Sequence, residues 1–195
     1  MLGDDPRQDR QIWLRRVQAA RLVDDARRGE RAALSLLVRT WTPKLGAHAW
    51  RLLGDADEAR EAVSGSWARI IEALPALRDA HAFPAFAYRM VTRQCAAMVG
   101  AKVRQRALHS ALRADEGGSD KACASADSPE RAAETDALHR AIRALPPDQR
   151  AAITLHYFED MSVAEIAVAL DTPAGTVKTR LLHARARLRL ALQGD

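Results

Sequence analysis

Cysteine is scarce in this sequence. Its 195 residues include two, Cys95 and Cys123, and neither lies in a CxxC pair or in a cysteine–histidine spacing that holds zinc. A disulfide framework and a structural metal site are therefore not expected. No run of eighteen apolar residues is present, and the opening MLGDDPRQDRQ is too polar for a signal peptide. These absences predict a reduced, cytoplasmic protein without membrane insertion.

Patterns that carry catalysis are also missing. The sequence has no glycine-rich loop of the kind that cradles phosphate, and no nucleophile stands in a recognisable pattern with a base. His156 and His183 are single histidines on predicted helices, where a structural role is more common than metal binding. The sequence therefore predicts no enzyme activity, no cofactor and no metal site.

Helical periodicity extends through almost all of the chain, and convincing strand alternation is absent. Apolar residues recur at three- and four-residue spacing from Ala59 to Leu74 and again from Phe83 to Met98. We therefore predict an all-α protein with two small helical domains, at residues 22–106 and 137–195. Residues 1–21 are predicted to be an N-terminal extension.

A change of composition separates the two predicted domains. Residues 107–136 contain few large apolar side chains and many small polar ones, with seven acids against three bases. This composition is typical of a flexible linker. The linker is acidic, whereas the whole chain has a net charge of +5.

Two capped helices are predicted near the C-terminus. Ser162 with Glu165 forms a capping box, and Thr172-Pro173 supplies an N-cap and a first-turn proline for the next helix. A short helix, a tight turn and a longer helix make a helix-turn-helix, whose second helix lies in the major groove of DNA. The turn carries Asp171 where glycine is usual, and aspartate tolerates left-handed backbone better than most residues.

The second of these helices is charged with one sign. Between Ala174 and Arg189 it carries five cations and no carboxylate. A solvated helix usually mixes both signs, so this one is expected to face phosphate. Small residues at its start allow the backbone to approach DNA closely. The candidate DNA contacts are Thr172, Ala174, Gly175, Thr176, Lys178, Thr179, Arg180 and Arg185.

A second acid-free basic segment extends over residues 89–106 and directly follows three aromatic residues, Phe83, Phe86 and Tyr88. Cations beside aromatic rings suit a separated DNA strand, because phosphates are neutralised while unstacked bases find a π surface. Phe83 and Phe86 share the apolar stripe and are expected in the core. Tyr88 and Arg89 lie off that stripe and are expected to contact DNA.

These motifs resemble a known family. Residues 145–192, LPPDQRAAITLHYFEDMSVAEIAVALDTPAGTVKTRLLHARARLRLAL, resemble region 4 of extracytoplasmic-function (ECF) sigma factors, through the Leu-Pro-Pro opening, the Ser-x-x-Glu-Ile-Ala helix and the Gly-Thr-Val-Lys-Thr-Arg run. The stretch RRGERAALSLLVRTWTPKLGAHAWRLLGDADEAREAV, followed by HAFPAFAYRMVTRQ, resembles region 2. The resemblance covers residues 22–106 and 137–192.

The resemblance implies a subunit of bacterial RNA polymerase that recognises promoter DNA. Region 2 would bind the core polymerase and open the −10 element, and region 4 would read the −35 element with the candidate contacts given above. An anti-sigma factor that clamps the two domains is the expected regulator. The implied −10 contacts are His81, Tyr88, Arg89, Arg93, Lys102 and Arg104.

One segment departs from the family pattern. The polymerase-docking helix, which would use Glu58, Glu61, Ser64 and Gly65, usually carries glutamine and an acid where this chain has Ser64 and Gly65. The change favours weaker or altered docking. It also leaves open a sigma-like decoy that titrates an anti-sigma factor without productive binding to core polymerase. An ordinary dimeric helix-turn-helix repressor or activator is a third hypothesis, but it leaves residues 83–106 unexplained.

Overall fold

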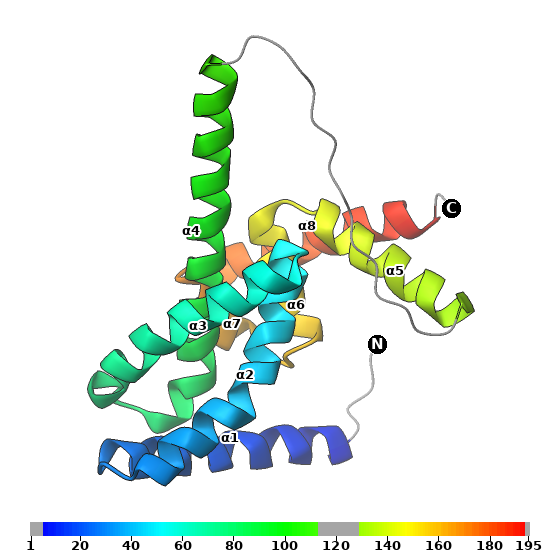
Figure 1. Ribbon diagram of the computed structural model, residues 1–195. Coiled ribbons are helices and arrows are strands. Elements are labelled where there is room, and N and C mark those ends of the chain that lie inside the picture. The colour runs from blue at the N-terminus through cyan, green and yellow to red at the C-terminus, as the bar shows by residue number, and fades with distance from the viewer. Residues whose placement is uncertain (1–5, 113–128, 194–195) are drawn as a thin grey trace.

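The computed structural model describes the backbone of residues 6–112 and 129–193, and the regular elements in these two ranges are all helical (Figure 1). The all-α prediction is confirmed. None of the described helices is both long and apolar enough to cross a membrane. The elements are α1 (Pro6–Arg27), α2 (Arg31–Leu53), α3 (Ala56–Ala73), η1 (Leu74–Ala76), η2 (Ala80–Ala82), α4 (Phe83–Leu112), α5 (Pro129–Ala144), α6 (Pro147–Tyr157), α7 (Val163–Leu170) and α8 (Ala174–Gln193).

Helices α1 to α4 form the N-terminal domain. Helix α2 packs against both α1 and α3, and α3 packs against α4. The core contains fully buried aliphatic and aromatic side chains from all four helices, and Phe83 meets Trp41 edge-on with ring centroids 5.2 Å apart. Phe83 is thus a core residue, as its place on the apolar stripe predicts.

Helix α1 extends across the predicted boundary between residues 21 and 22 and packs against α2. The helix continues unbroken through that boundary, and Ala19, Ala20 and Val23 are buried against neighbouring helices. Much of the contact is made by alanine, whose small side chain gives a weak apolar stripe in a segment rich in charge. The second half of α1 therefore packs on the N-terminal domain.

The ends of the predicted linker are helical. Helix α4 continues to Leu112 and α5 begins at Pro129, while residues 113–128 lie outside the described part of the chain. In Figure 1 the C-terminal half of α4 projects well beyond the helices packed around its first half. The strong helix formers alanine, leucine and arginine extend α4 past the point where its packing partners end.

Helices α5 to α8 form the C-terminal domain, with α8 packed on α5, α6 and α7. The capping box that opens α7 is present: the Ser162 hydroxyl accepts from the Glu165 backbone N–H, and the Glu165 carboxylate accepts from that of Ser162. Asp171 ends α7 in the left-handed conformation with φ 52°. The predicted helix-turn-helix is therefore formed by α7, this turn and α8.

The two domains are in direct contact. Helix α7 lies against α4, and α5 and α6 contact α2. Buried side chains of both domains join in one continuous cluster. This contact places the helix-turn-helix next to the N-terminal part of α4, where the second basic segment, residues 89–106, begins.

The stability of the N-terminal domain is expected to depend on pH through His48. This side chain is fully buried and lies 2.9 Å, Nε2 to Oγ1, from Thr92. Burial, with a smaller effect of Arg51, lowers the pKa of His48 to about 3. Below the unfolded-state value of about 6.5 only the unfolded chain binds the proton, so stability falls as the pH falls.

We expect the free energy of unfolding to fall by about 1.4 kcal/mol for each pH unit between pH 6.5 and the lowered pKa of His48. Urea unfolding at pH 7 and pH 5 would measure it, with His48→Gln as the comparison. The glutamine variant should lose about 2 kcal/mol less than the parent over this interval. Equal losses in the two proteins would exclude His48 as the source.

Candidate nucleic-acid interface

Helix α8 presents an exposed, basic face. Val177, Leu181 and Ala184 are buried and hold the helix on its domain. Thr176, Lys178, Thr179 and Arg185 are exposed, as are the small residues Ala174 and Gly175 at its start. The structure thus brings most of the predicted major-groove contacts onto one accessible surface.

Arg180 is engaged within its own domain. Its guanidinium donates to Asp148 Oδ2 at 2.6 Å and to Thr172 Oγ1 at 3.2 Å. The Thr172 hydroxyl in turn donates to the carbonyl oxygen of Leu170. Arg180 therefore ties the start of α8 to the start of α6, a long-range role that sequence spacing does not indicate.

Tyr88 differs from its predicted position on an open DNA face. Only 3% of its surface is exposed, and its ring packs edge-on against Trp41 and His48 at centroid distances of 6.1 and 5.2 Å. Its hydroxyl donates to the carboxylate of Glu159 in the C-terminal domain. Tyr88 lies off the main stripe of α4, but α2 and the α6–α7 loop cover that side of the helix.

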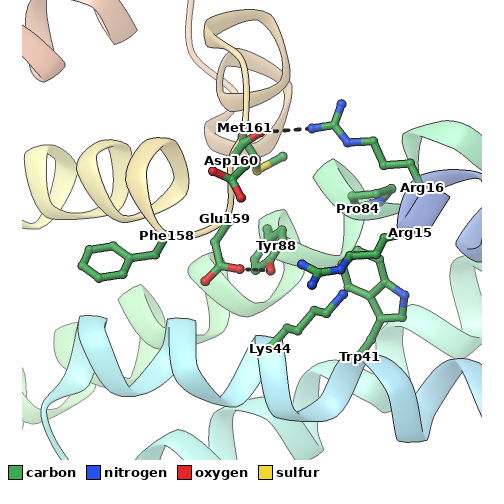
Figure 2. Close-up of a pocket in the computed structure, with 10 residues that line it drawn as sticks. All are labelled: Arg15, Arg16, Trp41, Lys44, Pro84, Tyr88, Phe158, Glu159, Asp160 and Met161. Atoms are coloured by element: carbon green, nitrogen blue, oxygen red, sulfur yellow. Dashed lines mark hydrogen bonds between the residues drawn. The ribbon is translucent and has the colours of Figure 1, made fainter. Parts of the chain in front are cut away.

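Glu159 occupies a pocket of about 140 Å³ between the domains (Figure 2). Its carboxylate accepts from Tyr88 and, at 2.9 Å, from Arg51 Nη1. Lys44 and Arg15 also line the pocket. Burial raises the pKa of Glu159, whereas the hydrogen bond from Tyr88 and the charge of Arg51 act to lower it. Burial lowers the pKa of Lys44. The site is therefore a desolvated carboxylate surrounded by cationic and aromatic groups of the other domain.

Asp171 makes the second acidic contact between the domains. Arg89 Nη2 and Arg93 Nη2 donate to its Oδ2 at 2.9 and 2.8 Å. A third contact joins Arg16 Nη1 to Glu165 Oε1 at 2.6 Å. In all of these pairs the cation belongs to the N-terminal domain and the acid to the C-terminal domain.

The remaining predicted contacts of the N-terminal domain are dispersed. His81 is exposed in η2, and Lys102 and Arg104 are exposed on the projecting half of α4. Lys102 forms an ion pair with Glu58 on α3. Two side chains predicted for different partners, DNA and polymerase, are therefore paired with each other.

The predicted docking face lies on α3. Glu61, Ser64 and Gly65 are exposed there, and Glu58 is the partner of Lys102. A Cβ atom added at Gly65 would lie 3.5 Å from the side chain of Gln94, an ordinary contact distance. A Cβ atom is therefore accommodated at this position without a steric clash.

Cys95 is the cysteine that lies within the described residues, and it is a core side chain. Cys95 is buried in the core, as its place on the apolar stripe predicts, and burial raises the pKa of its thiol to about 12. Cys123 lies outside the described residues. Across the two described ranges, no group of three or more histidine, cysteine or acidic residues is arranged to hold a metal ion.

Arg180 is expected to contribute to the stability of the C-terminal domain. Replacing it by glutamine removes the ion pair with Asp148 and should cost about 1 kcal/mol, since half of the pair is solvated. Urea unfolding would measure the change, with Lys178→Gln as a matched control at an exposed position of the same helix. The control should change stability by less than about 0.5 kcal/mol. Equal effects would mean that the Asp148 contact contributes nothing.

Comparisons with known proteins agree with this geometry. Residues 37–105 match the family model of Sigma-70 region 2, and residues 135–188 match that of Sigma-70 region 4. The RNA polymerase sigma-H factor of Pseudomonas aeruginosa is 32% identical over 187 residues, which cover 92% of this chain and 96% of that protein. The ECF RNA polymerase sigma-E factor of Escherichia coli K12 is 29% identical over 84% of this chain and 88% of its own.

Two solved structures share the fold. The sigma factor RpoE, in complex with the anti-sigma factor NepR from Bartonella quintana, superposes with a TM-score of 0.66 at 21% identity, over 83% of this chain and 98% of its own. CnrH, in complex with the cytosolic domain of CnrY, gives 0.66 at 20% identity, over 91% and 99%. Both regions match in order, and the Pseudomonas relative, at 32% identity, covers 92% of the chain, so the protein belongs to the ECF family of RNA polymerase sigma factors.

Proposed function

We propose that this sigma factor directs core RNA polymerase to specific promoters in the cytoplasm, reading the −35 element with α8 and binding the opened −10 strand with the start of α4. Core polymerase and promoter DNA are its partners, and an anti-sigma factor is its regulator. The relatives are named as RNA polymerase sigma factors, and the two solved structures of the same fold are complexes, one with a named anti-sigma factor. No catalytic chemistry of its own is part of the proposal.

The exposed cationic face of α8 carries this proposal. Thr176, Lys178 and Thr179 project from the first turns of the second helix of a helix-turn-helix, where side chains reach base edges. Arg185 lies two turns further along, with its guanidinium 6.0 Å from the ring centroid of Tyr157. Because Arg180 is paired with Asp148, Lys178 is the stronger candidate for a base contact.

Lys178→Ala should weaken −35 recognition by about 1–3 kcal/mol if Lys178 contacts a base. If it contacts phosphate alone, the loss should be uniform across promoters and the salt slope shallower by about one. Run-off transcription by reconstituted holoenzyme on a genomic promoter library would find the promoters. Binding to −35 variants of one promoter would then separate these two cases.

Arg187→Ala is the matched control, because Arg187 is exposed on the opposite flank of the same helix. It should leave promoter choice unchanged. Transcription that depends equally on Lys178 and Arg187, or on neither, would contradict the proposed orientation of α8.

The decoy remains a second candidate, and the α3 face favours it. Family members usually carry glutamine and an acidic residue at two positions of this face. Here the first position holds Ser64, with a short hydroxyl side chain, and the second holds Gly65, with no side chain. If this face docks on polymerase, the double change Ser64→Gln with Gly65→Glu should strengthen core binding by about tenfold, the effect of one or two charge-assisted hydrogen bonds.

Surface plasmon resonance with immobilised core enzyme would measure this affinity. Ser64→Gln with Gly65→Ala is the control, since it also removes the glycine from the middle of α3 but adds no carboxylate. Equal affinities of both doubles and the parent would show that this face is not used. If the parent and both doubles all fail to bind, the decoy is favoured.

A further inference from the structure

The start of α4 is covered by acidic side chains of the C-terminal domain. Arg89 and Arg93 share one oxygen of Asp171, the residue that forms the turn of the helix-turn-helix. Tyr88, which precedes Arg89 on α4, donates its hydroxyl to the carboxylate of Glu159, which also accepts from Arg51 of α2. Two carboxylates therefore bind Tyr88, Arg89 and Arg93 at the start of α4.

A DNA strand would need the same donors. Guanidinium groups bind phosphate oxygens with the geometry and charge with which they bind carboxylate oxygens. The Glu159 side chain is only 7% exposed, so no phosphate reaches Tyr88 or Arg51 while it is in place. Asp171 competes with phosphate less completely, because it holds one Nη2 of each of Arg89 and Arg93 while 55% of the Arg93 side chain stays exposed.

The spacing of promoter elements points the same way. Elements centred about 25 base pairs apart are separated by about 85 Å along B-form DNA, at 3.4 Å per base pair. Here the turn before α8 touches α4 directly, with Asp171 2.9 Å from Arg89. The two domains cannot contact both elements in this arrangement, so they must separate before both faces are used.

Four ion pairs across the contact have the same polarity, although Arg150 of the C-terminal domain also donates to the Leu52 carbonyl of the N-terminal domain. Arg16, Arg51, Arg89 and Arg93 belong to the N-terminal domain, and their partners Glu165, Glu159 and Asp171 belong to the C-terminal domain. Asp171 stands in a turn where glycine is usual and adopts the left-handed conformation that glycine would adopt more easily. Its carboxylate therefore supplies a contact to α4 that glycine would lack.

We propose that Glu159 and Asp171 are internal substitutes for promoter phosphates. The two carboxylates bind Arg51, Tyr88, Arg89 and Arg93, and they keep the free sigma factor closed until polymerase and DNA displace them. The inference rests on the proposed function, because it assigns the covered face to the −10 strand. The ligand that replaces the two acids is the phosphodiester backbone of single-stranded DNA.

The test removes the two charges and retains the backbone. Asp171→Asn keeps a residue that tolerates the left-handed conformation, and Glu159→Gln keeps an acceptor for the Tyr88 hydroxyl. Fluorescence anisotropy would measure binding of the free full-length protein to a labelled 15-nucleotide single-stranded DNA of mixed sequence. If closed molecules make up about nine-tenths of the parent, the double variant should bind about tenfold more tightly.

Small-angle scattering of the same samples should show a larger radius of gyration for the double variant. Glu72→Gln is the charge control, since Glu72 is exposed on α3 and its loss changes the net charge without touching the contact. It should leave both measurements at the parent values. Asp171→Asn alone is a milder variant, because asparagine tolerates the left-handed conformation of this turn. It should show a smaller increase in DNA affinity than the double variant.

Two results would overturn the inference. One is a double variant with unchanged DNA affinity and unchanged scattering. The other is a gain in affinity that persists when Arg89→Gln and Arg93→Gln are added to the double variant, because the exposed face would then not be the binding surface. Failure of the proposed function is separate: parent and double variant would both fail to direct run-off transcription by core polymerase, whatever their DNA affinity.

Discussion

The buried carboxylate of Glu159 sets the arrangement of the two domains. A carboxylate removed from water needs hydrogen-bond donors, and here Tyr88 and Arg51 supply them from the other domain. Such a pair roughly repays its own desolvation, and the exposed pairs at Asp171 contribute about 0–1 kcal/mol each. A partner that binds at nanomolar concentration releases about 12 kcal/mol, so these contacts fix a geometry without preventing its exchange.

The apolar part of the interface is also incomplete. A cleft of about 440 Å³ lies between α2, α4, α6 and α7, lined by side chains that include Leu52, Cys95, Val99 and Leu170. Because the cleft is open to solvent, the apolar atoms that line it stay in contact with water and gain no burial energy from the interface. Within each domain, by contrast, side chains such as Phe83 and Leu181 are fully or almost fully buried. The domains are therefore well-packed bodies joined by a looser contact.

Local features of this chain were predictable from sequence, and distant partners were not. The Ser162–Glu165 capping box and the helix-turn-helix depend on residues within one or two turns, so their spacing identifies them. The helical patterns predict DNA contacts for Tyr88 and Arg180, and in this structure the two side chains bind Glu159 and Asp148, which lie 71 and 32 residues away in the sequence. No pattern in one sequence specifies such pairings. The start of the N-terminal domain is equally hard to predict, because α1 packs through alanines, which give a weak apolar stripe.

The two candidate DNA faces are unequally available in this arrangement. On α8, Lys178 and Thr179 are open to solvent, whereas on α4, Tyr88 is buried and Arg89 is paired. Duplex DNA can therefore approach α8 without any rearrangement, but a separated strand can reach α4 only after Glu159 and Asp171 withdraw. On the proposed function, this asymmetry links strand binding to separation of the domains. Binding to polymerase would then expose the −10 face by holding the domains apart. Because the contact between the domains is weak, this separation would require little free energy.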